Sequence, residues 1–351
     1  MSVKTWLRNF DRYRRRKMAT LEPLLYRLFM NNSQNQSHLL QKKEVSSILI
    51  IRNNKRIGNI LFLIPFVKQV RASYPNAKIT LLLSQSWQKS IFENIGVDEI
   101  LVSNFSFSKV VSCLKLIRSL KRKSIDLMLV PYSSAEDSFI ASVLSAKNKI
   151  SSHSENRNEC FTHTFKNDSE LSHMAFNKLF LIKKLTHEEE LNNVCHKLAF
   201  SDSEELLGMK DRTLVYDGNK KLVAFFRGAR GKKQLSDQQW KDILIKFEEE
   251  SIEPIQWVEI LSSDISQPLS NQSLIYQNNN LRLLASFLKN VDTFISCDTG
   301  PLHLADAAGV NCIGLFTHTN SETYGVINGR SVNLYDWYHT DVTEHLSVMA
   351  Q

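Results

Sequence analysis

The chain contains few of the residues that interrupt regular structure, with 11 glycines and 7 prolines among 351 residues. It also lacks any C-x-x-C pair, which argues against a zinc or redox site. Its five cysteines therefore fit reduced thiols of a cytosolic protein; the cysteines are Cys113, Cys160, Cys195, Cys297 and Cys312. No run of about 18 apolar residues occurs, and the N-terminus has no apolar signal-peptide core. We therefore expect neither a disulfide framework, nor a bound metal, nor a transmembrane helix.

Two common phosphate-binding motifs are also absent. No G-x-G-x-x-G follows the first predicted strand, which argues against a dinucleotide-dependent oxidoreductase. No G-x-x-x-x-G-K-[ST] occurs, which argues against a P-loop NTPase. Any nucleotide ligand would have to be bound by other groups.

Positive charge is concentrated at the N-terminus. Residues 1–29 carry eight basic side chains and two acidic ones, a net +6 of the chain's formal +8, with aromatic and leucine side chains at near-helical spacing. Such a basic helix can lie on an anionic membrane surface. We favour this interpretation over a helix packed on its own domain, and both over an RNA-binding arm, so no nucleic-acid partner is predicted. Residues 31–44 are polar and of low complexity, which makes 1–44 an arm and linker.

From Val45 onward, predicted strands and helices alternate. Apolar, β-branched runs are typical of buried strands, and they are residues 46–53, 77–84, 97–103 and 125–131. Residues 60–75 have the spacing of a helix kinked at Pro65, and residues 171–200 have that of a long helix. The stretch after the fourth strand, "YSSAEDSF", is predicted as a loop.

The second half repeats the strand-helix pattern. A polar stretch, residues 201–221, separates the halves, and we place the boundary near residue 215. Because such repetition predicts parallel sheets covered by helices on both faces, we expect an α/β fold of two Rossmann-like domains, 45–215 and 216–351, facing a central cleft. Ligands should bind at the carboxyl ends of the strands.

The motif "FISCDTGPLHLADAAG" combines a buried strand with a candidate anion site. Asp298 and Thr299 follow the strand, and Gly300 permits a tight turn and close approach of a ligand. The free amides at the start of the next helix can bind phosphate, and His303 could point back at the same site. The alternative is an Asp/Thr helix cap without a ligand.

A second motif, "FFRGARGKKQ", places glycine and cations at another strand end. The glycines, including Gly228, and the cations Arg227, Arg230, Lys232 and Lys233 suit a diphosphate, and the alternative is a solvated basic loop. Because both motifs follow strands of the same half, they should converge on one sheet edge and favour an anionic, nucleotide-like ligand.

The sequence resembles glycosyltransferase family 9, the ADP-heptose:lipopolysaccharide heptosyltransferases. The resemblance spans about residues 45–335 and rests on four ordered segments: "ILIIRNNKRIGNILFLIPFVKQVRASYPNAKITLLL", "VAFFRGARGKKQLSDQQW", "NLRLLASFLKNVDTFIS" and "DTGPLHLADAAGVNCIGLF". It implies a GT-B fold with the acceptor on the N-terminal domain and the donor on the C-terminal one. It further implies inverting transfer without metal or other cofactor, from ADP-heptose to a lipid-linked glycan at the cytoplasmic face of the inner membrane.

The resemblance also implies roles for individual residues. The donor's sugar and diphosphate would be held by Asp298, Thr299, Gly300 and His303, with phosphate charge neutralised around Gly228 by Arg230 and Lys232 or Lys233. On the acceptor side, the junction after the first strand contributes Arg56 and Gly58.

One position departs from the family pattern. The residue after Gly58 is usually an aspartate that acts as general base, and here it is Asn59. An amide cannot take a proton at neutral pH. Three explanations compete: Asn59 orients the acceptor while another carboxylate, Glu136 or Asp137, is the base; the donor reacts without a strong base; or catalysis has been lost. For Glu136 and Asp137 the alternative is a helix cap or a solvated loop acid.

Two functions therefore remain open. The first is transfer of a heptose or similar sugar to a lipopolysaccharide core or related glycan, favoured by the complete donor motifs. The second is a non-catalytic GT-B protein that binds a nucleotide or glycan, favoured by Asn59.

Overall fold

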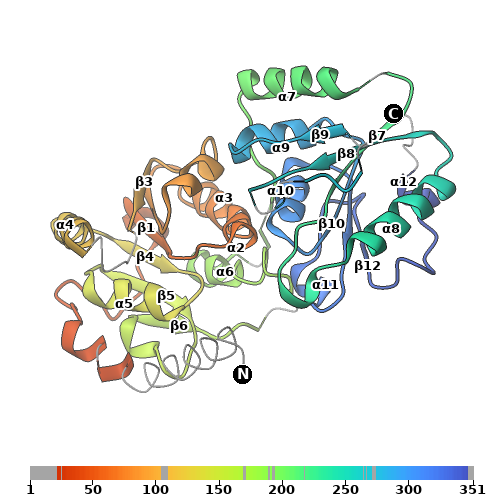
Figure 1. Ribbon diagram of the computed structural model, residues 1–351. Coiled ribbons are helices and arrows are strands. Elements are labelled where there is room, and N and C mark those ends of the chain that lie inside the picture. Colours follow the sequence, from red (N-terminus) through yellow and green to blue (C-terminus); the bar gives the residue numbers. More distant parts are fainter. Residues whose placement is uncertain are drawn as a thin grey trace.

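The computed structural model describes residues 22–346, except residue 25, residues 104–109, 169–170, 189, 192–193, 217, 264, 266 and 271–273, and the side chains of 110–114. The described chain forms two α/β halves, each built around one sheet (Figure 1). The basic arm predicted over residues 1–29 lies mostly outside the described residues.

The N-terminal sheet has the order β3-β2-β1-β4-β5-β6, and all its pairs are parallel. Its strands are β1 (Ser47–Arg52), β2 (Lys78–Leu83), β3 (Glu99–Val102), β4 (Leu127–Val130), β5 (Asn148–Ser152) and β6 (His163–Phe165). The first strand of this half lies beside the fourth, so the strand order reverses between β1 and β4.

The C-terminal sheet repeats this topology with the order β12-β11-β10-β7-β8-β9, again all parallel. Its strands are β7 (Lys221–Phe226), β8 (Ile255–Ile260), β9 (Leu274–Tyr276), β10 (Thr293–Cys297), β11 (Cys312–Leu315) and β12 (Val332–Leu334). The order reverses between β7 and β10, and such switch points are where open α/β sheets bind ligands. The predicted pair of parallel sheets is confirmed.

Helices cover both faces of each sheet. The α-helices are α2 (Ile57–Leu61), α3 (Ile64–Ser73), α4 (Val110–Lys121), α5 (Ala135–Val143), α6 (Phe180–Thr186), α7 (Asp202–Val215), α8 (Asp237–Glu250), α9 (Leu281–Lys289), α10 (Gly300–Ala308), α11 (Ser321–Tyr324) and α12 (Thr343–Leu346). Short 3-10 helices are η1 (Lys42–Glu44), η2 (Ser86–Phe92), η4 (Asn158–Cys160) and η5 (Gly231–Lys233). Within these ranges no helix is both long and apolar enough to cross a bilayer.

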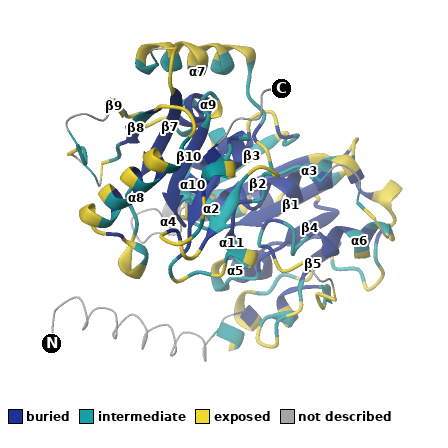
Figure 2. Ribbon diagram, turned by 90° about the vertical axis from the view of Figure 1, so that its right-hand side faces the viewer, coloured by how far each residue is buried: buried dark blue, intermediate teal, exposed yellow. Residues whose placement is uncertain are grey.

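The central strands are buried on both faces, as the dark blue of β1, β7 and β10 in Figure 2 shows. In β7 the side chains alternate: Leu222 and Ala224 join the core that faces the other half, whereas Val223 and Phe225 join the core under α8. This period of two is set by the pleat. A continuous apolar run is thus what a doubly covered parallel strand requires.

The helix predicted over residues 60–75 is two helices rather than one kinked helix. Backbone helicity is interrupted at Phe62 and Leu63, and Pro65 lies in the first turn of α3. A proline has no backbone N–H, and the first turn of a helix needs none for its own hydrogen bonds. Pro65 therefore starts a helix here, where the sequence predicted a bend within one.

The long helix predicted over residues 171–200 is wrong, because α6 is the only helix among the described residues of that range. Before α6, the backbone of Met174 donates to the carbonyl of Thr323 at 2.9 Å, and His173 Nε2 lies 3.0 Å from the carbonyl oxygen of Gly325. After α6, the backbone of Leu198 donates to Ala307 at 2.7 Å. These bonds to the C-terminal half replace the ones a helix would make.

The polar stretch predicted as a separator forms α7, which begins with a capping box between Ser201 and Glu204. Figure 1 shows α7 lying along α9 at the outside of the C-terminal half. A Cβ on Gly208 would lie 2.5 Å from the carbonyl oxygen of Ser286, so α7 can pack this closely only with glycine there. The domain boundary near residue 215 stays a prediction.

The loop predicted after β4 is also helical, because Ser134 caps α5 by accepting a bond from the backbone of Asp137 at 3.1 Å. Asp137 is fully buried, contrary to the helix-cap and solvated-loop alternatives. Its Oδ1 accepts from the backbone N–H of Asn53 at 2.5 Å, and Oδ2 lies 3.7 Å from Nη1 of Arg52. Burial raises the pKa of Asp137 to about 6, so the carboxylate is ionised at neutral pH. Asp137 thereby anchors the loop between β1 and α2.

Replacing Asp137 with alanine should destabilise the fold by about 3 kcal/mol, because Arg52 and the Asn53 amide would be left buried without their acceptor. Asp137→Asn keeps an acceptor oxygen and should cost less. Denaturant unfolding at pH 7 measures both. Equal stability of Asp137→Ala and the parent would show that the carboxylate does not hold this loop.

Candidate active site where the two sheets meet

Asp298, directly after β10, is the centre of the candidate site. It is 8% exposed, with Oδ1 3.0 Å from Nε2 of His303 and Oδ2 2.8 Å from Nζ of Lys233. Lys233 also donates to the Asp298 carbonyl oxygen at 2.8 Å. Burial favours the neutral acid, but the bonds from His303 and Lys233 prevail and hold the pKa of Asp298 well below its ordinary value. Asp298 is therefore ionised and paired with cationic or donor groups on two sides.

The structure brings the two predicted motifs together. Lys233 comes from the loop after β7 and Asp298 from the end of β10, and these two strands flank the switch point of the C-terminal sheet. Arg230 and Lys232 are exposed on the same loop, at either side of Gly231. A Cβ on Gly228 would lie 2.4 Å from the ring of Phe226, so the loop turns too tightly there for a larger residue. The carboxyl edge of the C-terminal sheet therefore carries several basic side chains around the buried Asp298 carboxylate.

The start of α10 supplies backbone donors at this edge. Thr299 is the N-cap residue, and its side chain makes no capping bond within the described structure. Its hydroxyl lies 3.0 Å from that of Ser296, which in turn donates to the carbonyl of Phe226 at 2.9 Å. The first amides of α10 thus keep their capacity to bind an anion.

The helix α10 packs directly against α2 of the N-terminal half. A Cβ on Gly58 would lie 2.6 Å from Cδ2 of His303, and a Cβ on Gly300 would lie 3.0 Å from Cβ of Ile57. Phe62, just after α2, meets the His303 ring edge to face with centroids 4.7 Å apart. Since α2 follows β1 and α10 follows β10, the carboxyl edges of the two sheets face each other here.

Asn59 and Arg56 lie on the N-terminal side of this contact. The Asn59 amide is half-buried and donates to Oδ1 of Asn54 at 3.3 Å, and the backbone of Arg56 donates to the same oxygen at 2.9 Å. The Arg56 side chain is exposed. The carbonyl of Asn54 accepts from Gln88 Nε2 at 2.5 Å and from the Ser84 hydroxyl at 2.7 Å. The loop before α2 is therefore held by its own side chains and by the end of β2.

Sequence reasoning missed Arg52, and it counted Arg227 among the cations available to a phosphate although Arg227 is paired within the protein. Arg52, at the end of β1, stacks on Tyr132 with its guanidinium carbon 4.1 Å from the ring centroid. Arg227 donates to the fully buried Glu259 at 2.5 Å, and Glu259 accepts from the backbone of Leu269 at 2.6 Å. A charged residue at the end of an apolar strand was the available signal for Arg52.

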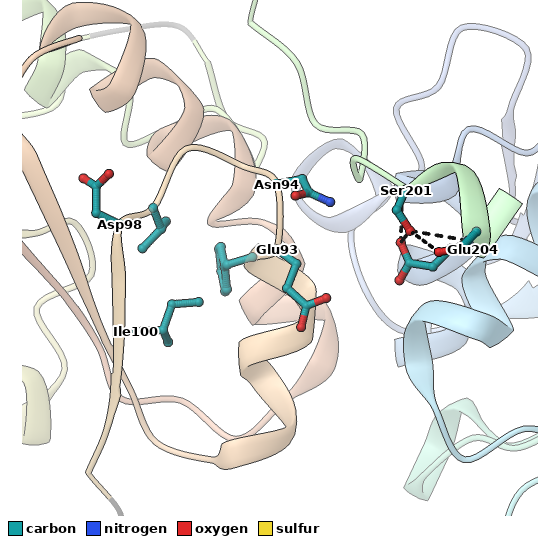
Figure 3. A pocket seen from close by; sticks show the side chains of 9 residues that line it. Glu93, Asn94, Asp98, Ile100, Ser201 and Glu204 are labelled. Atoms are coloured by element: carbon teal, nitrogen blue, oxygen red, sulfur yellow. Dashed lines mark hydrogen bonds between the residues drawn. The ribbon is translucent and has the colours of Figure 1, made fainter.

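A cleft of about 560 Å³ also separates the halves, away from Asp298. Figure 3 shows Glu93 and Asn94, which follow η2, on one side and Ser201 and Glu204 at the start of α7 on the other. Arg282, on α9, binds Glu204 and donates to the Ser90 carbonyl at 3.0 Å, which ties the halves together beside the cleft. Its lining is acidic, so it is poorly suited to a nucleotide.

Comparison with known proteins agrees with this architecture. A family model described as glycosyltransferase family 9 (heptosyltransferase) matches residues 113–345. A glycosyl transferase family 9 structure from Veillonella parvula superposes with a TM-score of 0.70 at 16% identity, covering 82% of this chain and 85% of that one. No curated protein sequence matches.

Two Escherichia coli structures are also similar. The heptosyltransferase WaaC, solved with ADP, has a TM-score of 0.66 at 12% identity, covering 85% of this chain and 96% of its own. The ADP-heptose lps heptosyltransferase II has a TM-score of 0.65 at 15% identity, covering 86% and 96%. At these identities the likeness concerns the fold, which is the predicted GT-B arrangement. With the family model matching most of the chain, the protein belongs to glycosyltransferase family 9 and is a glycosyltransferase.

Proposed function

We propose that this chain transfers a heptose or similar sugar from an ADP-linked donor to a lipopolysaccharide core or related membrane-linked glycan. The observation that carries the proposal is the group formed by Asp298, Lys233 and the amide end of α10 at the C-terminal switch point. A WaaC structure with ADP-2-deoxy-2-fluoro heptose supports this donor class. The acceptor would approach from the loop before α2, which carries Arg56, Gly58 and Asn59.

The chemistry that this site supports is stabilisation of a leaving diphosphate. The acceptor hydroxyl attacks the anomeric carbon from the side opposite the diphosphate, the bond between that carbon and the phosphate oxygen breaks, and the hydroxyl proton passes to solvent, so the configuration inverts. Negative charge then grows on the leaving phosphate, where Lys233, Arg230 and Lys232 supply cations and α10 supplies amides. We propose that Thr299, Gly300 and His303 position the donor, and that no metal ion takes part. In the described residues no cluster of three His, Cys, Asp or Glu side chains could hold one.

The donor assignment predicts that ADP and ADP-heptose raise the melting temperature, whereas UDP, GDP and CMP do not. A ligand at about 100 times its Kd stabilises a protein by about 2.7 kcal/mol. Lys233→Ala should abolish the shift, and Lys241→Ala, on the outer side of α8, is the matched control. Transfer is then measured with ADP-heptose and a deacylated core acceptor. Binding without turnover would favour the non-catalytic function, and no shift with any nucleotide would contradict the donor site.

Because Asn59 cannot act as a general base, we predict that sugar transfer is slow and that an aspartate at this position would accelerate it. A positioned general base contributes about 10² to 10⁴ in rate, and Asn59→Asp places a carboxylate at the residue after Gly58. We expect kcat to rise at least about tenfold at pH 8, whereas Asn59→Ala should not raise it. An unchanged kcat in Asn59→Asp would mean that this position does not face the attacking hydroxyl. Asp137 is buried and bonded to the backbone of Asn53, so we propose that it positions the loop before α2 and does not act as the base. The variant Asp137→Asn should therefore have the same kcat as the parent.

We further propose that residues 1–29 bind the anionic inner-membrane surface on its cytoplasmic face, where the acceptor would be anchored. At the described end of this segment, Leu24 is 57% and Leu28 68% exposed. Tyr26 is buried, and its hydroxyl donates a hydrogen bond to Oε2 of Glu22 at 3.1 Å. A cut after residue 21 therefore removes the basic arm and keeps this contact.

Deleting residues 1–21 should abolish sedimentation with vesicles of phosphatidylglycerol and phosphatidylethanolamine, since most of the basic side chains are lost. The full chain should bind these vesicles at low salt and not bind neutral phosphatidylcholine vesicles. Equal sedimentation of the truncated and full chains would contradict a membrane role for the arm.

A further inference from the structure

His303 has one ring nitrogen in the donor site and one in the protein interior. Nε2 lies 3.0 Å from Oδ1 of Asp298, whereas Nδ1 is buried and makes no hydrogen bond to any described residue. The whole side chain is 6% exposed, and the ring is confined by Phe62 and by Gly58. An unpaired buried ring nitrogen is costly, so a partner for Nδ1 is expected.

His303 also lines a small cavity. The cavity leaves about 10 Å³ open to the centre of a water molecule, which is enough for one water. Its apolar lining comes from both halves and from the segment before α6, and consists of Leu61, Phe62, Ala175, Ala307 and Ile327. Its polar lining consists of His303, His196 and Asp306.

Of the two other polar residues, Asp306 is held by backbone donors and His196 lies beside it. Asp306, on α10, accepts from the backbone of Ile327 at 3.1 Å and of Asn328 at 2.9 Å. His196 lies on the segment between α6 and α7, and its Nε2 is 3.9 Å from Oδ2 of Asp306. This separation is too long for a direct hydrogen bond, and within the described chain His196 Nε2 is likewise buried without a partner.

We infer that one water molecule occupies this cavity and links His303 to His196 and Asp306. The water donates one hydrogen bond to Nδ1 of His303 and one to the Asp306 carboxylate, and it accepts one from Nε2–H of His196. Three bonds are the usual number for a buried water. With Nδ1 accepting, the N–H of the His303 ring is on Nε2, where it is donated to Asp298.

His196 and Asp306 are thereby positioning residues for the donor site. They touch neither Asp298 nor the leaving diphosphate, but they fix the His303 tautomer that holds the Asp298 carboxylate. Asp298 in turn orients Lys233. The consequence for donor affinity rests on the proposed function, whereas the tautomer and the water do not.

The experiment compares the parent with His196→Phe, which keeps a ring and removes the donor, and with His196→Gln, which keeps a donor. Nitrogen-15 NMR of labelled histidine, assigned with His303→Gln, reports which nitrogen of His303 is protonated. We expect protonation on Nε2 in the parent and in His196→Gln, and a mixture of tautomers in His196→Phe. A crystal structure of the parent should show the water in the cavity.

Donor binding gives the second measurement. Loss of one hydrogen bond corresponds to about a fivefold change in affinity, so the Kd of ADP should rise about fivefold in His196→Phe and return in His196→Gln. Protonation of His303 on Nδ1 in the parent would overturn the inference, as would equal ADP affinity of His196→Phe and the parent. If the parent binds no ADP, the proposed donor is wrong, and NMR and the crystal structure still decide whether the water is there.

Discussion

The packing of α2 on α10 is the constraint on which the rest of the site depends. These helices start at the carboxyl edges of different sheets, and each has a glycine at the point of contact, Gly58 against His303 and Gly300 against Ile57. Any larger residue at Gly58 would push the halves apart, because the His303 ring is held by Asp298 and Phe62. Gly58, in the first turn of α2, thus brings the loop before α2 close to the carboxyl edge of the C-terminal sheet.

At this contact, electrostatics and packing act on the same side chains. Asp298 is buried, yet it stays ionised because Lys233 and His303 surround it. The donors are therefore oriented before a ligand arrives, which is what stabilises a developing charge most effectively. A diphosphate bound there, as we propose, would compete with Asp298 for Lys233. The Asp298 carboxylate would therefore weaken the bond between Lys233 and the phosphate.

The sequence predicted the sheets well because buried parallel strands are continuous apolar runs, and all four runs named in the N-terminal half became strands. The convergence of Lys233 on Asp298 followed from the rule that parallel strands end at one edge. The predictions failed where distant contacts decide the local structure. Residues 171–200 have helical spacing, but their backbone forms hydrogen bonds with the C-terminal half. Asp137 lies in a polar stretch typical of a loop, but its carboxylate is buried and accepts a hydrogen bond from the backbone of Asn53.

The segment between α6 and α7 gives the molecule a further property. Lys68 on α3 donates to the carbonyl of Lys197 at 2.7 Å, and Leu198 donates to α10, so the crossing chain is bound to both halves. One apolar core also continues from Ile50 in β1 to Phe294 in β10. An exchange of C-terminal halves between relatives would therefore cut through a shared interior, whereas a change within a single loop would leave that interior intact.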